Sequence, residues 1–195
     1  MTWYTFFKSV HVAAAAIWFG GALMIQAFAF RIIRTKDARR MAEFAKDSEV
    51  VGMRVFIPAT WVLLLAAIGL MLNADLSWGQ NWIVLGLIAW ILSFVVGAGF
   101  LGPEGGRIAK IIESEGPESP AAQFRIARIL LVSRLELVIL LTVIVNMVAK
   151  PVGNGGWFWG LLAAMVLGLA GVLAAAYSSS SMRSAPPATR SPSAM

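Results

Sequence analysis

Five long apolar runs are the feature that most constrains what this chain can fold into. Crossing a bilayer core of about 30 Å takes roughly 20 mostly apolar residues in helical form. Runs of that kind cover about residues 5–30, 51–73, 81–101 and 126–149, with a fifth inside 153–178. Because a helix satisfies its own backbone polar groups, helices are the natural way for such runs to cross lipid. The sequence predicts an all-α, polytopic transmembrane helix bundle with a four-helix core over 1–152, a fifth helix, and a disordered Ser/Pro/Ala-rich tail over 179–195.

Composition agrees with a membrane setting. Only 13% of the 195 residues are charged, whereas a soluble domain carries about a quarter. The net charge of +6 does not indicate nucleic-acid binding, because the basic residues cluster in short segments between the apolar runs. The expected partner is therefore the lipid bilayer. The absence of Cys excludes disulfides, iron–sulfur clusters and thiolate metal sites.

The basic residues also predict an orientation. They gather after the first run and after the third, at Arg31, Arg34, Lys36, Arg39, Arg40, Lys46, Arg107, Lys110 and Arg125. The alternate loops carry none, or Lys150 alone. The positive-inside rule then places the N-terminus outside and the C-terminus in the cytoplasm of a bacterial inner membrane. In that orientation an aromatic belt falls at the outer interface, made of Trp3, Tyr4, Trp78, Trp82, Trp157 and Trp159.

Two segments between the runs are amphipathic. Residues 31–50 place Met41, Phe44 and Ala45 at helical spacing, which is typical of a short helix on the inner membrane surface. Residues 107–115 repeat the pattern with isoleucines. The Gly- and Pro-rich stretch 102–106 is expected to break the third helix before that second amphipathic segment.

Small residues at helical spacing predict where helices touch. They are Ala13, Ala16 and Gly20 in the first run, Ser93 and Gly97 in the third, and Gly160, Ala164 and Gly168 in the fifth. Such faces let helix backbones approach closely. They suit contacts within one bundle and a homo-oligomer equally well.

His11, the only histidine, lies about two turns into the first apolar run. It shares a helix face with Trp18, about 10 Å away. An ionisable group inside a membrane is a candidate functional site by default. One interpretation is a cofactor or proton site facing the bundle interior; the other is a histidine that hydrogen-bonds a backbone carbonyl and only fixes packing.

Two methionines could join His11 in a cofactor or metal site. Met71 and Met147 fall near the outer ends of the second and fourth runs, at a depth similar to that of His11. A His/Met set could hold Cu(I) or supply axial ligands to haem b. A single histidine excludes bis-His haem ligation within one chain. Methionine is also common core filler, which favours a packing role for both residues.

A second group of charged residues lies in the cytoplasmic half of the predicted bundle. Arg54, Arg134 and Glu136 all fall inside apolar runs, where charges need partners. We expect a structural ion pair between helices, either Arg54 with Glu136 or Glu49 with Arg134. A polar path for a proton or an anionic ligand is the sharper but less favoured interpretation.

Several motifs carry a family resemblance. Val10-His11, Trp18, Gly20-Gly21 and the stretches 51–58, 97–103 and 131–136 resemble a family of predicted integral membrane proteins of unknown function, over about residues 4–152. The first helix is also distantly similar to copper-resistance D proteins and to the membrane-bound, haem-binding protoporphyrinogen oxidase. The fifth helix and tail look like additions to this core.

The resemblance implies a fold and a bacterial setting, but no activity. His11 matches the position implicated in tetrapyrrole binding in the haem-binding relatives, which also use a later lysine. The second to fourth runs of this chain contain no lysine. The hypothesis is a membrane protein that binds haem or another tetrapyrrole through His11; the alternatives are copper handling or transport, and a structural subunit without catalysis.

Overall fold

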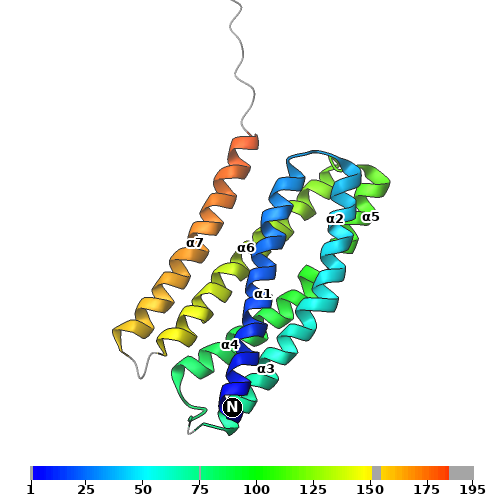
Figure 1. The fold of residues 1–195 in the computed structure, drawn as a ribbon. Coiled ribbons are helices and arrows are strands. Elements are labelled where there is room, and N and C mark those ends of the chain that lie inside the picture. The colour runs from blue at the N-terminus through cyan, green and yellow to red at the C-terminus, as the bar shows by residue number, and fades with distance from the viewer. Residues whose placement is uncertain (1, 75, 151–154, 185–195) are drawn as a thin grey trace, which may run out of the picture.

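The chain forms a bundle of long antiparallel helices (Figure 1). The computed structural model describes residues 2–74, 76–150 and 155–184, and all regular structure within them is helical. Its elements are α1 (Trp3–Ile33), α2 (Ala38–Val51), η1 (Gly52–Phe56), α3 (Ile57–Leu72), α4 (Asn81–Val96), η2 (Gly97–Leu101), α5 (Gly102–Glu115), α6 (Pro120–Ala149) and α7 (Gly156–Ser184). Five helices of this part of the chain are long and apolar enough to cross a membrane. The predicted all-α bundle with five spans is confirmed.

Two of the spans are longer than the apolar runs. α2 continues through η1 into α3, and α4 continues through η2 into α5, giving helices over Ala38–Leu72 and Asn81–Glu115. Both η1 and η2 are single π-helical turns, and each is followed by a proline near the start of the next segment, Pro58 and Pro103. Proline removes one backbone donor and crowds the carbonyl of the preceding turn. A widened π-turn relieves that conflict, so the expected helix break at 102–106 was wrong.

The two amphipathic segments pack against each other. α2 and α5 lie side by side at one end of the bundle (Figure 1). Their apolar faces, with the start of α6, form a buried cluster of Met41, Ala42, Ala45, Ile108, Ala109, Ile112, Ala122 and Ile126. The apolar stripe of each segment is covered by the other. The segments are therefore extensions of two spans and not separate helices on the membrane surface.

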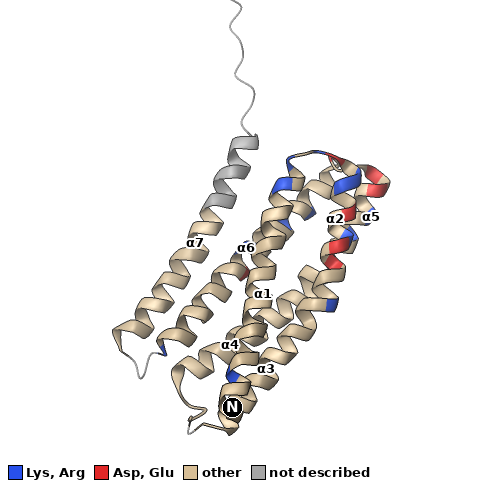
Figure 2. Cartoon of the chain, in the orientation of Figure 1, with Lys and Arg blue, Asp and Glu red and all other residues tan. Residues whose placement is uncertain are grey.

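Charged residues gather at the end of the bundle that contains α2 and α5 (Figure 2). One carboxylate there is fully buried: Glu104, with 1% of its side chain exposed. It accepts hydrogen bonds from Arg125 on α6 at 2.7 Å and from Arg107 at 3.2 Å. Lys46 on α2 pairs with Glu113 on α5. These ion pairs tie α2, α5 and α6 together.

Only some residues of the predicted small-residue faces lie at contacts between helices. Ser93 on α4 is buried, and Gly168 on α7 packs against Val138 of α6. Ala13 and Ala16 on α1 are exposed, and so are Gly160 and Ala164 on α7. The contact that α1 makes with η1 runs instead through Gly21, which lies against the ring of Phe56. The predicted homo-oligomer through small-residue faces stays a prediction.

The bounds of the last helix differ from the predicted ones. α7 runs to Ser184, past the predicted end at 178, and packs against α6 (Figure 1). The predicted disordered tail falls mostly on residues 185–195, which lie outside the described residues.

Candidate functional site

His11 connects two helices through one hydrogen bond. Its Nδ1 lies 3.1 Å from the carbonyl oxygen of Leu63 on α3. A carbonyl oxygen only accepts, so Nδ1 carries the proton and donates, and Nε2 of the neutral ring is left with its lone pair. The ring is partly buried between α1 and α3. This is the packing arrangement that the sequence left open as the second interpretation.

Two of the other predicted ligands, Met71 and Trp18, lie away from His11 along their helices. Met71 follows Leu63 by eight residues on α3, which is about 12 Å along the helix axis. Met147 packs over Gly86 on α4. Trp18 is 9% exposed and lines a cavity that His11 does not reach. Within the described part of the chain, no group of three or more His, Asp or Glu residues could hold a metal ion.

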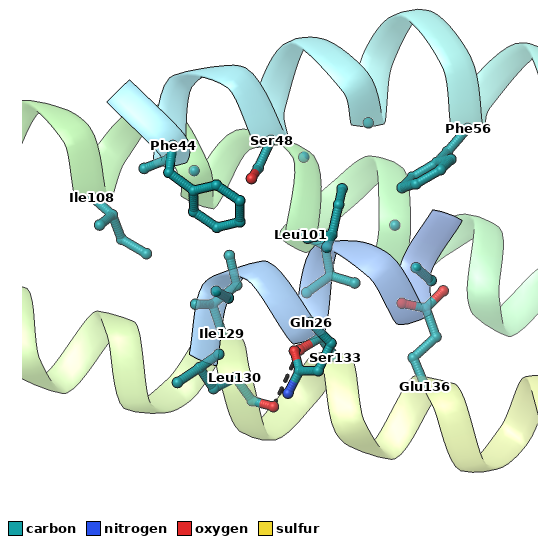
Figure 3. Close-up of a pocket in the computed structure, with 18 of the residues that line it drawn as sticks. Gln26, Phe44, Ser48, Phe56, Leu101, Ile108, Ile129, Leu130, Ser133 and Glu136 are labelled. Atoms are coloured by element: carbon teal, nitrogen blue, oxygen red, sulfur yellow. Dashed lines mark hydrogen bonds between the residues drawn. The ribbon is translucent and has the colours of Figure 1, made fainter. Parts of the chain in front are cut away.

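The cavity itself lies among the helices of the bundle, with walls from α1 to α6 and both π-turns, η1 and η2 (Figure 3). Its volume is about 170 Å³. On α1 the lining runs from Trp18 to Ile33, about 22 Å of helix. The wall is overwhelmingly apolar and includes Phe44, Phe56, Phe94, Leu101, Ile108, Ile129 and Leu130.

Five neutral polar side chains interrupt this apolar wall: Gln26, Ser48, Thr60, Ser93 and Ser133. The hydroxyl of Ser133 donates to Oε1 of Gln26 at 2.8 Å and so joins α6 to α1 (Figure 3). Thr60 donates to the carbonyl of Phe56 one turn earlier. The buried hydroxyl oxygens of Ser48 and Ser93 have no hydrogen-bond partner in the structure. Buried polar atoms are nearly always satisfied, so these two hydroxyls need an explanation.

Glu136 is the remaining polar group of the cavity. Its residue is 8% exposed, and its side chain extends from α6 toward the space beside Phe56 (Figure 3). Among the described residues, no hydrogen bond or ion pair to its carboxylate is seen. It is therefore a carboxylate that faces an apolar cavity and has no partner in the described part of the chain.

The predicted ion pairs of Arg54, Arg134 and Glu136 are not formed. Both arginines are exposed on the outside of the bundle, and Glu49 does not pair with Arg134 in the described part of the chain. Residues two apart on a helix are about 200° apart around its axis. Because Glu136 faces inward, Arg134 faces outward. The buried ion pairs belong to Glu104 instead, which sequence reasoning placed in a helix break.

The sequence analysis predicted no cavity: it singled out Trp18 beside His11 and Glu136 as an ion-pair partner, and it assigned no site role to the other polar lining residues. A usable signal existed, because Gln26, Ser93 and Ser133 each stand as isolated polar residues inside apolar runs. Polar residues in membrane helices tend to face the bundle interior. Glu104 also carried a signal, since Arg107 follows it at the i, i+3 spacing of helical ion pairs.

Five membrane-length helices, four of which line an apolar cavity with one carboxylate among the described residues, define a small polytopic membrane protein. Residues 5–151 match the family described as predicted integral membrane protein (DUF2269), and the chain belongs to that family. The predicted family resemblance is thereby confirmed, and the match ends before α7. No curated protein and no solved structure matches the chain.

Proposed function

We propose that this protein binds a small lipophilic molecule inside the membrane, in the cavity enclosed by α1 to α6 with the turns η1 and η2. The observation that carries the proposal is the cavity itself, with its volume of about 170 Å³ and its apolar wall. Protein interiors are normally close-packed. Apolar cavities of about 150 Å³ in other proteins take up molecules the size of benzene. The space in this bundle suits a ligand of at least that size.

The polar groups of the wall support binding of a particular ligand in a particular orientation. Ligand sites are mostly apolar, with a few polar groups that fix orientation. Here those groups are the unpartnered hydroxyls of Ser48 and Ser93 and the carboxylate of Glu136. A ligand with hydrogen-bond donors or acceptors at matching positions would satisfy them.

The setting that we propose is a bacterial inner membrane with the charged end of the bundle in the cytoplasm. The support is the positive-inside rule together with the concentration of Arg and Lys around α2, α5 and the adjoining helix ends (Figure 2). The cavity then lies in the cytoplasmic half of the bilayer. Alkaline phosphatase fused after Lys150 is expected to be active, because that loop then lies outside; an inactive fusion there and an active one after Thr35 would reverse the orientation.

Ligand-dependent thermal stability tests the binding proposal. The purified protein in a nonionic detergent is heated with a series of small aromatic and aliphatic compounds, and Tm is followed by far-UV circular dichroism. At a ligand concentration of about 100 Kd, binding adds about 2.7 kcal/mol to the free energy of unfolding. At least one compound is expected to raise Tm; no rise with any compound would count against the proposal.

Cavity-filling variants make that test specific. Ala29 lines the cavity and is 8% exposed, whereas Ala27 on the same helix faces outward. Ala29→Leu should abolish the ligand-induced rise and Ala27→Leu should keep it. Ser93→Leu fills the cavity from α4 and serves as a second variant if Ala29→Leu does not fold. Equal responses of all these variants would show that the compounds bind elsewhere.

Haem binding through His11 is a second candidate function. Its support is the hydrogen bond from Nδ1 to Leu63, because metal-ligating histidines usually donate their other N–H to a carbonyl or carboxylate. Nε2 would be the ligand atom, and the group would lie outside the cavity, which His11 does not line. A visible spectrum of protein expressed with ample haem tests this, and absence of a Soret band would contradict it.

A further inference from the structure

Glu136 is the only charged side chain among the described residues that line the cavity. It is 8% exposed, and no residue of the described chain hydrogen-bonds or pairs with its carboxylate. An ionised carboxylate in apolar surroundings is very costly unless a positive charge or several hydrogen bonds accompany it. The cavity therefore lacks a partner for a group that needs one.

None of the side chains around the cavity supplies that partner. α1 contributes the amide of Gln26, whose Oε1 accepts from Ser133 of α6, and the indole of Trp18, and no hydrogen bond from either to Glu136 is seen among the described residues. α3 contributes Thr60, which donates to its own helix, and α2 and α4 contribute the hydroxyls of Ser48 and Ser93. These groups are all neutral. The positive charges of Arg54 and Arg134 lie on the outside of the bundle.

Aromatic rings lie at the same end of the cavity as Glu136. Figure 3 shows Phe56 at that end, on the side of η1. α1 and α6 run antiparallel, with Gln26 bonded to Ser133, so Trp18 lies at a level about one and a half turns beyond Glu136. The faces of Trp and Phe rings attract cations, and the attraction is stronger in sites without water. A carboxylate and aromatic rings in one apolar site form a receptor for a positively charged group on an apolar body.

We propose that the ligand of this cavity is a lipophilic organic cation, an amine or quaternary ammonium whose charged nitrogen lies against Glu136. This inference rests on the proposed function, because it names the chemical class of the molecule that the cavity holds. Protonation of Glu136 is the alternative way to neutralise the carboxylate. A site with a protonated Glu136 would bind charged and neutral ligands of the same shape equally well. A preference for the cation therefore distinguishes an ionised Glu136 from a protonated one.

The test uses two probes that differ in charge alone. Benzyltrimethylammonium and neopentylbenzene have the same shape, with a quaternary nitrogen in one and a carbon in the other. Binding of radiolabelled benzyltrimethylammonium to the full-length protein in nonionic detergent gives its Kd, and competition gives that of neopentylbenzene. Glu136→Gln removes the charge at nearly constant shape. Glu115→Gln on the exposed end of α5 is the matched control.

The cation is expected to bind about tenfold or more tightly than the neutral probe, because coupling energies of close buried charge pairs begin at about 1.5 kcal/mol, which corresponds to about tenfold in Kd. Glu136→Gln should remove this preference while neopentylbenzene binding and Tm stay unchanged, and Glu115→Gln should behave as wild type. If both probes bind equally and Glu136→Gln changes neither, the charge inference is wrong and the proposed function stands. If neither probe binds and no compound raises Tm, the proposed function fails and the inference with it.

Discussion

The carboxylate of Glu104 accepts a hydrogen bond of 2.7 Å from Arg125, which joins α5 to α6. Its other partner, Arg107, is 57% exposed and 3.2 Å away. We predict that Arg125→Ala lowers the free energy of unfolding by about 2 kcal/mol or more, because it leaves a buried carboxylate with only an exposed partner. Arg107→Ala should cost less than about 1 kcal/mol, as an exposed pair does.

Unfolding in mixed micelles with increasing SDS, followed by circular dichroism, measures both arginine variants. Lys110→Ala is the control, because it removes an exposed positive charge from the same helix without touching Glu104. Equal losses for Arg125→Ala and Arg107→Ala would show that Glu104 does not depend on the shorter contact.

Gly105 sets the distance between α2 and α5. A Cβ built at this position would lie 2.7 Å from the backbone carbonyl oxygen of Ala45. Backbone cannot move as a flexible side chain does, so we predict that Gly105→Ala costs about 1–3 kcal/mol of unfolding free energy. Gly20→Ala on α1, where a Cβ would meet nothing within 4 Å, should be neutral or stabilising by up to about 1 kcal/mol. SDS unfolding of both variants tests this, and an unchanged midpoint for Gly105→Ala would contradict the close approach.

The π-turns predict an unusual tolerance of deletions. One π-turn accommodates about one residue more than an α-turn. Deleting the exposed Gly99 from η2 should therefore convert that turn to α-helix while α4 and α5 keep their faces. Deleting the exposed Leu141 from α6, which has no π-turn, rotates one half of that helix by about 100° and should prevent folding.

Size-exclusion chromatography of detergent extracts measures the two deletions. The Gly99 deletion should elute as a single symmetric peak with wild-type yield, and the Leu141 deletion should aggregate. Aggregation of both would mean that η2 is not a one-residue insertion that the bundle can lose.

The number and type of spans followed from the sequence because hydrophobicity and length alone decide which segments enter lipid. The continuity of α4 with α5 could not be predicted from the sequence, because the low helix propensity of Gly102 and Pro103 predicts a break. Proline and glycine are also compatible with a π-turn, which keeps the helix continuous here, and α5 then packs along α2. Local signals do not distinguish a break from a π-turn.

The candidate site was likewise predictable only in part from the sequence. Glu136 was identifiable as a charge within an apolar run, and Trp18 because it shares a helix face with His11. Their partners were not, since pairing depends on how helices rotate against each other. A rotation of α6 that turns Glu136 inward turns Arg134 outward. The cavity forms only where the first four membrane spans meet.

Substitutions of His11 separate a packing role from a ligand role. Loss of the hydrogen bond to Leu63 in His11→Leu should lower the free energy of unfolding by about 0.5–1.5 kcal/mol. His11→Gln retains an N–H donor of similar reach and should lose less. Neither variant can ligate haem, so both should lack any Soret band that wild type shows. SDS unfolding and a visible spectrum on the same preparations decide the question: equal stability of all three proteins would contradict the packing role, and a Soret band kept by His11→Leu would contradict the ligand role.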